Sequence, residues 1–202
     1  FDIQPDPGQL AAGRAWRAAL ARPVLLLAST REGEEKLLLD ALPPWDRKLL
    51  VVVVPRHPQR FDEVAQMADA RRSQGTVTGE ERIYLGDTMG EMAFYYGACD
   101  VAVMGGSFVP VGGQNLIEAL AAGAPVVIGP SVYNFAQATQ LALEAGAAAQ
   151  AGDAGSGIRE ALRLLEAEPE RRAMGEAGRR LCEANRGATA RHVAVCRRLL
   201  KL

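Results

Sequence analysis

The chain has 202 residues, of which 49% are hydrophobic and 23% are charged, and this balance is typical of a globular protein that buries a sizeable core. Its 23 basic and 24 acidic residues give a net charge of -1, so no global positive field favours nucleic acid or anionic lipid. The longest apolar runs, such as residues 49–54, fall far short of the roughly 20 residues of a membrane-spanning helix. We therefore expect one large domain without a nucleic-acid partner and without a membrane-spanning segment of its own.

Short β-rich runs alternate with longer helical patterns, and this alternation predicts an α/β fold with a Rossmann-like parallel sheet and helices on both faces. The predicted strands are residues 24–28, 49–54, 83–85, 101–104, 126–128 and 147–150, with an edge strand around 76–78. The predicted helices run from about residue 32 to 42, then 58–72, 90–97, 114–122 and 134–145. Residues 158–202 form a helical C-terminus with expected breaks at Pro169 and near residues 185–187.

The cysteines and histidines point to neither disulfides nor a protein-held metal. Cys99, Cys182 and Cys196 are an odd number without a CxxC pair, and we expect them to be reduced and structural. His57 and His192 are far apart and lack partners at metal-ligand spacing. We expect no metal ion and no cofactor.

Polar and glycine-rich segments follow four of the predicted strands, at residues 29–35, 55–58, 86–91 and 105–118. In an open parallel sheet, ligands bind outside the carboxyl ends of the strands, where such loops converge. We therefore expect these four segments to line one crevice.

Several common sites are absent from these loops. The sequence has no GxxxxGK[ST] phosphate loop and no GxGxxG after its first strand, which argues against a kinase-type NTPase or an NAD dehydrogenase. Ser107 lacks the second glycine of a GxSxG nucleophile elbow, and neither histidine is placed to act as its base. There is also no DxD pair to hold a metal ion against a diphosphate.

The remaining signal is an anion or nucleotide site. Gly112 and Gly113 would let a phosphate approach the backbone at the start of the following helix, and Asn115 and Glu118 would share one face of that helix. A carboxylate one turn from a phosphate-binding end can accept hydrogen bonds from ribose hydroxyls. The alternative is a tight glycine turn followed by a solvent-facing Glu118, and the residues alone favour neither.

Three further residues each have a functional and a structural interpretation. Arg56 follows an apolar strand and could hold a phosphate, or else form a surface salt bridge. Thr88 and Glu91 have the T-x-x-E spacing of a helix capping box. His57 is expected to fix its loop rather than to act as a base, because the neighbouring Arg56 disfavours its protonation.

Taken together, these loops resemble those of bacterial 3-deoxy-D-manno-octulosonic acid (Kdo) transferases of lipopolysaccharide and lipid A synthesis. The resemblance covers nearly the whole chain. It rests on the runs STREGEE (29–35), VPRHP (54–58), GDTMGE (86–91), GGS (105–107) and GGQN (112–115), with GP (129–130) and NF (134–135) beyond them.

The resemblance implies that residues 1–202 are the C-terminal half of a two-domain GT-B glycosyltransferase, namely its donor-binding domain, and that the donor is CMP-Kdo. The first residue is Phe1 rather than Met, which also suggests a piece of a longer protein. The implied N-terminal domain would bind the lipid A precursor, supply the catalytic base and contact the cytoplasmic face of the inner membrane. No catalytic residue is then expected in this chain, and the isolated domain should be inactive. The CMP-contacting positions of the family carry over to Pro55, Arg56, Met89, Gly90, Glu91, Asn115, Leu116, Ile117 and Glu118.

The sequence departs from the family pattern at two places. Arg31 stands where a histidine is expected, and Gln114-Asn115-Leu116 stands where His-Asn-Pro is usual. Gln114 can still donate a hydrogen bond but cannot act as an acid or a base. The alternatives to a Kdo transferase are another GT-B enzyme, such as a UDP-sugar transferase or a sugar-nucleotide 2-epimerase, and a non-catalytic nucleotide-binding module.

Overall fold

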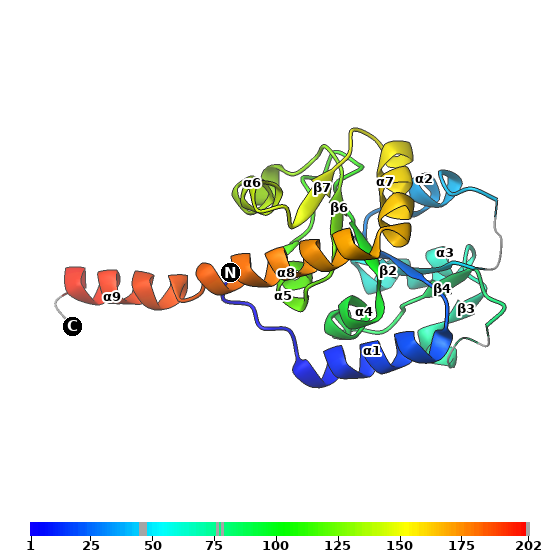
Figure 1. Cartoon of the computed structure of the whole chain (residues 1–202), viewed down its shortest axis with the longest axis horizontal. Helices are drawn as coiled ribbons and strands as arrows, with labels where there is room; N and C mark the ends of the chain where they lie inside the picture. The colour runs from blue at the N-terminus through cyan, green and yellow to red at the C-terminus, as the bar shows by residue number, and fades with distance from the viewer. Residues whose placement is uncertain (45–47, 76, 78, 201–202) are drawn as a thin grey trace.

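The computed structural model describes residues 1–44, 48–75, 77 and 79–200, and these fold into a seven-stranded sheet between two layers of helices (Figure 1). The strand order is β3-β4-β2-β1-β5-β6-β7, and every recorded strand pair is parallel. The predicted Rossmann-like α/β fold is therefore confirmed. The strands are β1 (Val24–Thr30), β2 (Leu50–Pro55), β3 (Ala70–Arg71), β4 (Ile83–Leu85), β5 (Val101–Met104), β6 (Val126–Ile128) and β7 (Ala148–Gln150).

Nine α-helices are described, together with 3-10 turns at Pro58–Arg60, Arg72–Gln74 and Tyr133–Phe135. The helices are α1 (Pro7–Leu20), α2 (Glu34–Asp40), α3 (Phe61–Ala65), α4 (Met92–Ala98), α5 (Ile117–Ala122), α6 (Ala136–Glu144), α7 (Ala154–Glu166), α8 (Glu168–Ala184) and α9 (Ala188–Leu200).

The two faces of the sheet bury separate hydrophobic clusters because successive side chains of a strand point to opposite sides. Leu26 of β1 belongs to the cluster shared with α4 and α5, whereas Leu25 and Leu27 belong to the cluster shared with α2, α3 and α7. All three leucines are completely buried. This two-sided burial explains why the central strands are uninterrupted apolar runs.

Helix α1 was missed by the sequence analysis, which placed no element before residue 24. Asp6 caps it, since its side-chain Oδ1 accepts a hydrogen bond from the backbone N of Gln9 at 2.7 Å, and Pro7 follows at the first helical position. Gly13 lies so close to α4 that a Cβ atom there would be 2.0 Å from the carbonyl oxygen of Phe94. Helix α1 is thus packed tightly against α4, and only a glycine permits this approach.

Two predictions for residues 58–78 were wrong or fall outside the described residues. The expected helix 58–72 is a 3-10 turn followed by α3, which ends at Ala65, and the chain then forms the short strand β3. Asp69 redirects the chain, because its Oδ2 accepts hydrogen bonds from the backbone N atoms of Arg82 and Ile83, both at 2.8 Å. The expected edge strand at 76–78 cannot be compared, since residues 76 and 78 lie outside the described residues.

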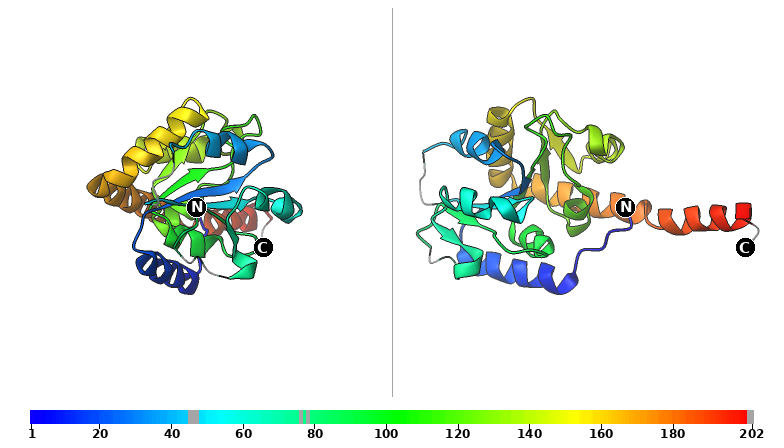
Figure 2. Two further views of the ribbon diagram at one scale, coloured as in Figure 1. Left: turned by 90° about the vertical axis from the view of Figure 1, so that its right-hand side faces the viewer. Right: turned by 180° about the vertical axis from the view of Figure 1, so that it is seen from behind.

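The helical C-terminus is confirmed, with different boundaries. The break between α7 and α8 is at Ala167, and Pro169 lies in the first turn of α8, where its missing N–H costs nothing. Helix α9 projects from the domain in Figure 1 and in the right view of Figure 2, and Val193, Val195, Leu199 and Leu200 are exposed on it. In the part of the chain that the structure describes, no helix is long and apolar enough to cross a membrane.

The three cysteines are free thiols, as expected, but they differ in burial. Cys182 is buried and Cys99 is half-buried, whereas Cys196 is exposed on α9. The expectation that all three are structural is therefore wrong for Cys196.

Candidate functional site

The four polar segments meet at one edge of the sheet. Strand β1 pairs with β2 on one side and with β5 on the other, so the chain runs in opposite directions across the sheet from β1. In this topology the loops after β1 and β5 separate and leave a crevice at the carboxyl edge. The loops after β2 and β4 lie beside it, as expected from the sequence.

A pocket of about 60 Å³ at this edge contains five of the nine predicted donor-binding residues. Its lining includes Pro55 and Arg56 after β2, and Met89, Gly90 and Glu91 after β4. The other four predicted residues, 115–118, lie on the loop and helix after β5 and do not line this pocket. The pocket has room for only part of a nucleotide, because ligand sites for whole small molecules measure roughly 300–1,000 Å³.

Arg56 is the exposed cation of this pocket. Within the described residues its guanidinium has no carboxylate at ion-pair distance, whereas the nearby arginines Arg60, Arg71 and Arg72 are all paired with carboxylates. The surface salt bridge considered as an alternative is therefore not formed. An arginine without a carboxylate partner at the carboxyl edge of a sheet can bind an anion.

Glu91 is held in place by Arg72. The Arg72 Nη2 and Nε atoms donate to Glu91 Oε1 and Oε2 at 2.9 and 3.2 Å, and Thr88 also donates to Glu91 through its hydroxyl. The Arg72 hydrogen bond is the main cause that lowers the pKa of Glu91 below its usual range. The predicted capping box is wrong: Glu91 itself precedes α4 and no side chain caps that helix, because Thr88 bonds to the Glu91 carboxylate instead of a backbone N–H.

The loop at residues 105–113 is not the expected phosphate cradle. The backbone N of Gly112 donates to Ser131 Oγ at 2.9 Å, and the backbone N of Gly113 donates to the carbonyl oxygen of Gly106 at 2.7 Å. Helix α5 begins only at Ile117, three residues after the expected start at Gln114. The two glycines therefore shape the loop and have no free N–H for an anion.

Asn115 and Glu118 have different environments. The Asn115 side-chain Oδ1 accepts a hydrogen bond from the backbone N of Ile117 at 3.0 Å and so fixes the start of α5. Leu116 is 1% exposed and packs in the core. Glu118 is half-buried, and within the described residues no cation is paired with it. Burial raises the pKa of its carboxyl, and this carboxylate can accept hydrogen bonds from a ligand.

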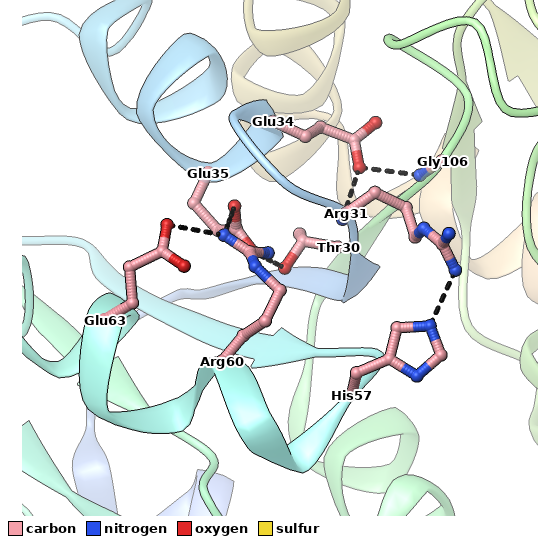
Figure 3. A network of polar contacts seen from close by, with 8 residues as sticks. All are labelled: Thr30, Arg31, Glu34, Glu35, His57, Arg60, Glu63 and Gly106. Atoms are coloured by element: carbon pink, nitrogen blue, oxygen red, sulfur yellow. Dashed lines mark hydrogen bonds and ion pairs between the residues drawn. The ribbon is translucent and has the colours of Figure 1, made fainter.

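Two buried carboxylates beside the crevice were missed as site components (Figure 3). Glu34 Oε2 accepts hydrogen bonds from the backbone N of Gly106 at 2.6 Å and of Arg31 at 3.0 Å, and its Oε1 accepts from the backbone N of Phe108 at 3.0 Å. Glu35 Oε1 accepts from the Thr30 hydroxyl at 2.6 Å and from Arg60 Nη1 at 2.5 Å. The sequence shows a run of acidic residues here but not that two of them turn inward.

Arg31 and His57 join the loops after β1 and β2. The Arg31 Nη1 atom donates to His57 Nε2 at 2.8 Å, so this ring nitrogen is unprotonated and the ring carries its proton on Nδ1 (Figure 3). Desolvation lowers the pKa of His57, as do the charges of Arg31 and Arg56. The expected loop-fixing role and the disfavoured protonation of His57 are both confirmed.

The pocket also contains residues that sequence reasoning did not select, namely Ser29, Thr88, Met92 and Tyr95. Ser29 has φ 56°, a left-handed conformation that is uncommon for residues other than glycine and that coincides with an irregularity in the β1–β2 register. The Tyr95 hydroxyl is buried and has no hydrogen-bond partner among the described residues. The aromatic run 94–96 indicates burial but not which ring reaches the pocket.

Larger hollows lie away from this edge. One of about 420 Å³ is lined by residues that precede β1 and β2, such as Pro23 and Leu49, together with Leu162 and Leu165 of α7. It is therefore at the amino edge of the sheet. The polar residues predicted to bind a ligand are not among its lining.

Comparison with known proteins shows which family the chain belongs to. Residues 46–181 match the family described as glycosyl transferases group 1. The chain is 47% identical to the 3-deoxy-D-manno-octulosonic acid transferase of Bordetella pertussis over 95% of this chain and 48% of that protein, and 35% identical to the Haemophilus influenzae enzyme of the same name over 84% and 42%. The chain thus spans about half the length of these relatives.

Solved structures show the same fold. The C-terminal CMP-Kdo binding domain of WaaA from Acinetobacter baumannii superposes with a TM-score of 0.81 at 30% identity, covering 87% of this chain and 98% of that domain. Anabaena HepE, solved with UDP and glucose, gives a TM-score of 0.68 at 16% identity over 100% of this chain and 55% of that one, a likeness of fold alone. The predicted C-terminal half of a GT-B glycosyltransferase is confirmed as the fold, and the chain belongs to the glycosyl transferases group 1 family.

Proposed function

We propose that the chain is the donor-binding part of a Kdo transferase and that it binds CMP-Kdo. The Bordetella pertussis and Haemophilus influenzae relatives carry the Kdo transferase name, and the Acinetobacter baumannii domain is a CMP-Kdo binding domain. The observation that carries the proposal is the pocket at the carboxyl edge, where Arg56 lies beside residues 89–91 and has no carboxylate partner among the residues that the structure describes.

Each predicted residue has a role in this proposal that its geometry supports. Arg56 binds the phosphate of CMP, since its guanidinium is exposed and is not paired with any carboxylate of the described residues. Glu118 accepts hydrogen bonds from the ribose hydroxyls, because its half-buried carboxylate has no cation partner among the described residues. Pro55, Met89, Gly90, Asn115 and Ile117 contribute backbone and apolar surface, whereas Leu116, whose side chain is buried in the core, contributes its backbone alone. Glu91, bonded to Arg72 and Thr88, keeps the loop of residues 88–91 in place.

The role of this chain in the proposed reaction is electrostatic. When the bond between the sugar and the phosphate breaks, negative charge grows on the departing CMP, and Arg56 stabilises it. Preorganised donors of this kind contribute about 3 kcal/mol each to the transition state.

The remaining functions are assigned to the part of the relatives that this chain does not span. That part supplies the carboxylate base, binds the lipid A precursor and contacts the cytoplasmic face of the bacterial inner membrane. The proposal therefore gives this chain nucleotide binding without turnover.

Calorimetric titration of the chain with CMP, with UMP as the control ligand, tests the proposal. We expect saturable binding that prefers CMP, and Arg56→Ala should weaken it by about tenfold or more, since hydrogen bonds to charged groups contribute about 1.5–3 kcal/mol. Glu118→Ala should weaken it as well, and Glu118→Gln less, because the amide keeps one acceptor oxygen. Unchanged affinity in both alanine variants would contradict the assignment.

The same titration separates the alternatives. A preference for UMP or UDP over CMP would favour a UDP-sugar transferase or a 2-epimerase. A chain that unfolds cooperatively on heating but binds none of these nucleotides would favour a module that only contacts a partner.

Metal removal gives an independent check. We propose that CMP binds without a metal ion, since Arg56 lines the pocket and can bind the phosphate, and since the sequence lacks a DxD pair. The affinity for CMP should therefore be the same with and without EDTA. A loss of binding in EDTA would require a metal in the site.

A further inference from the structure

Two arginines at the carboxyl edge have no carboxylate partner among the described residues, and one of them lines the pocket while the other does not. Arg56 lines the pocket with residues 89–91, whereas Arg31 is absent from its lining. Arg31 directly follows β1 and Arg56 directly follows β2, which is the parallel neighbour of β1. In the described part of the chain neither guanidinium forms an ion pair, so the edge carries two uncompensated charges at separate positions.

Gln114 lies beside Arg31 over a single glycine. An ideal Cβ atom placed on Gly106 would be 3.1 Å from the Gln114 side-chain Nε2, 3.2 Å from Val111 Cγ2 and 3.4 Å from Arg31 Cγ, so the Gln114 amide and the aliphatic part of Arg31 lie next to the same glycine. Gly106 has φ +68°, where any other residue would be strained and would also fill this space. The Gln114 amide makes no hydrogen bond in the described residues, and it can donate to a ligand.

The surroundings keep Arg31 and Gly106 in place. Arg31 is oriented by its hydrogen bond to His57 Nε2, and Glu34 holds the backbone N atoms of Arg31 and Gly106 on one carboxylate oxygen. The pKa of His57 is lowered by desolvation and by the nearby arginines, so the ring stays neutral and keeps accepting from Arg31 at neutral pH. The Arg31 guanidinium is therefore preorganised rather than free to move.

Arg31 and Gln114 are also the two positions at which the resemblance described above leads us to expect histidines. Both side chains lie next to Gly106, so the two departures are neighbours in the fold. The charge at this spot is then fixed on an arginine instead of varying with the protonation of a histidine.

We propose that Arg31 and Gln114 form a subsite for the carboxylate of a sugar-acid donor, separate from the phosphate site at Arg56. The inference rests on the proposed function, because an octulosonic acid linked to CMP carries two anionic groups, the phosphodiester and the sugar carboxylate. The planar guanidinium of Arg31 matches a carboxylate geometrically. A neutral hexose would leave the positive charge of Arg31 without a partner, so this subsite selects sugar acids.

The test is a set of titrations with CMP, CMP-Kdo and the C1 methyl ester of CMP-Kdo. Arg31→Ala should lower the affinity for CMP-Kdo by about tenfold or more and that for CMP by less than about twofold, as expected for loss of one charged hydrogen-bond donor. Gln114→Ala should show the same selectivity with a smaller loss. The methyl ester should bind the unmodified chain about as weakly as CMP-Kdo binds Arg31→Ala.

The controls separate this inference from the proposed function. Arg172→Ala removes one positive charge from an exposed side chain on α8 and should leave all three affinities unchanged. Arg31→Lys keeps the positive charge at this position. Unfolding midpoints measured for both Arg31 variants show whether a loss of affinity comes from a folding defect. Failure of the unmodified chain to bind CMP would remove the proposed function and the subsite together.

Other outcomes overturn the subsite alone. If CMP binds and Arg31→Ala weakens CMP and CMP-Kdo equally, Arg31 binds the phosphate and no carboxylate subsite exists there. If CMP binds and Arg31→Ala changes neither affinity, Arg31 has no role in donor binding.

Discussion

Two neighbouring regions of the carboxyl edge are held together by different physics. In the first, after β3 and β4, side chains pair with side chains: Arg71 binds Asp87 at 2.9 Å and Arg72 binds Glu91 at 2.9 Å. We refer to these four residues as the ion-paired corner. In the second, residues 105–113, which we call the clamped loop, the backbone N atoms of Gly106 and Phe108 donate to the buried carboxylate of Glu34. The buried Ser107 hydroxyl of this loop accepts a hydrogen bond from the backbone N of Gly129.

The difference predicts how each region responds to change. Arg72 and Glu91 are each 28% exposed, so their attraction is screened by water and salt. Glu34 and Ser107 are fully buried, so water cannot take the place of either side chain. Removing either one leaves its hydrogen-bond partners unsatisfied. The clamped loop should therefore be costly to disturb, whereas the Arg72–Glu91 pair of the ion-paired corner should tolerate change.

Glu34→Ala should give the largest effect. It removes the acceptor for the backbone N atoms of Arg31, Gly106 and Phe108, and we expect the free energy of unfolding to fall by about 3–5 kcal/mol, since each unsatisfied buried group costs about 1–3 kcal/mol. Urea unfolding measures it.

The neighbouring Glu32 provides a matched control because it is exposed on the same loop. Glu32→Ala should change the free energy of unfolding by no more than about 0.5 kcal/mol. Equal effects of the two substitutions would show that the loop is not held by Glu34.

The strands and two of the helices differ in how well the sequence predicts them. Strands 83–85, 101–104 and 126–128 were predicted with the bounds observed, because apolar runs limited by polar residues report burial directly. Helix α1 was missed since its contact with α4 depends on Gly13 meeting a backbone 81 positions away, at Phe94. The helix predicted at 58–72 ends early because Asp69 accepts a hydrogen bond from the backbone N of Ile83 in β4. Local periodicity carries no information about such a long-range contact.

The same limit applies to the site. Arg56 and Glu91 could be selected because their positions after strands are readable in the sequence. The loop at Gly112 and Gly113 was misinterpreted because its N–H groups are used by Ser131 and Gly106, partners that only the folded chain brings near. The sequence thus predicts which loops meet but not which of their hydrogen bonds are already taken.

Ser107→Ala should have the next largest effect within the clamped loop. The Ser107 hydroxyl donates to the carbonyl oxygen of Met104 at 2.6 Å and accepts from the backbone N of Gly129 at 2.7 Å. Losing both should cost about 2 kcal/mol of unfolding free energy. A cost near zero would mean that water replaces the hydroxyl and that the loop is less buried than its contacts indicate.

Arg72→Ala should cost less, about 1 kcal/mol, because its ion pair with Glu91 is partly exposed. Screening should reduce this cost further at about 1 M salt. The cost of Ser107→Ala, which involves no charge, should stay constant over the same salt range. Parallel salt dependence of the two variants would erase the distinction between the regions.

The smallest expected effect is a difference in pH dependence between Glu34→Gln and Glu91→Gln. In the folded chain Arg72 is the main cause that lowers the pKa of Glu91 below 4.5, so its contribution to stability is present above that pH and is lost as the pH falls through the lowered pKa. Desolvation raises the pKa of Glu34 above 4.5, so its contribution is complete below that pH and declines as the pH rises through the raised pKa. Urea unfolding at pH 7 and at about pH 4 should therefore show a larger cost of Glu91→Gln at pH 7 and a larger cost of Glu34→Gln at the lower pH. If both substitutions cost more at pH 7 than at about pH 4, the hydrogen bonds from Arg31, Gly106 and Phe108 outweigh the desolvation of Glu34, and both carboxylates are held as anions.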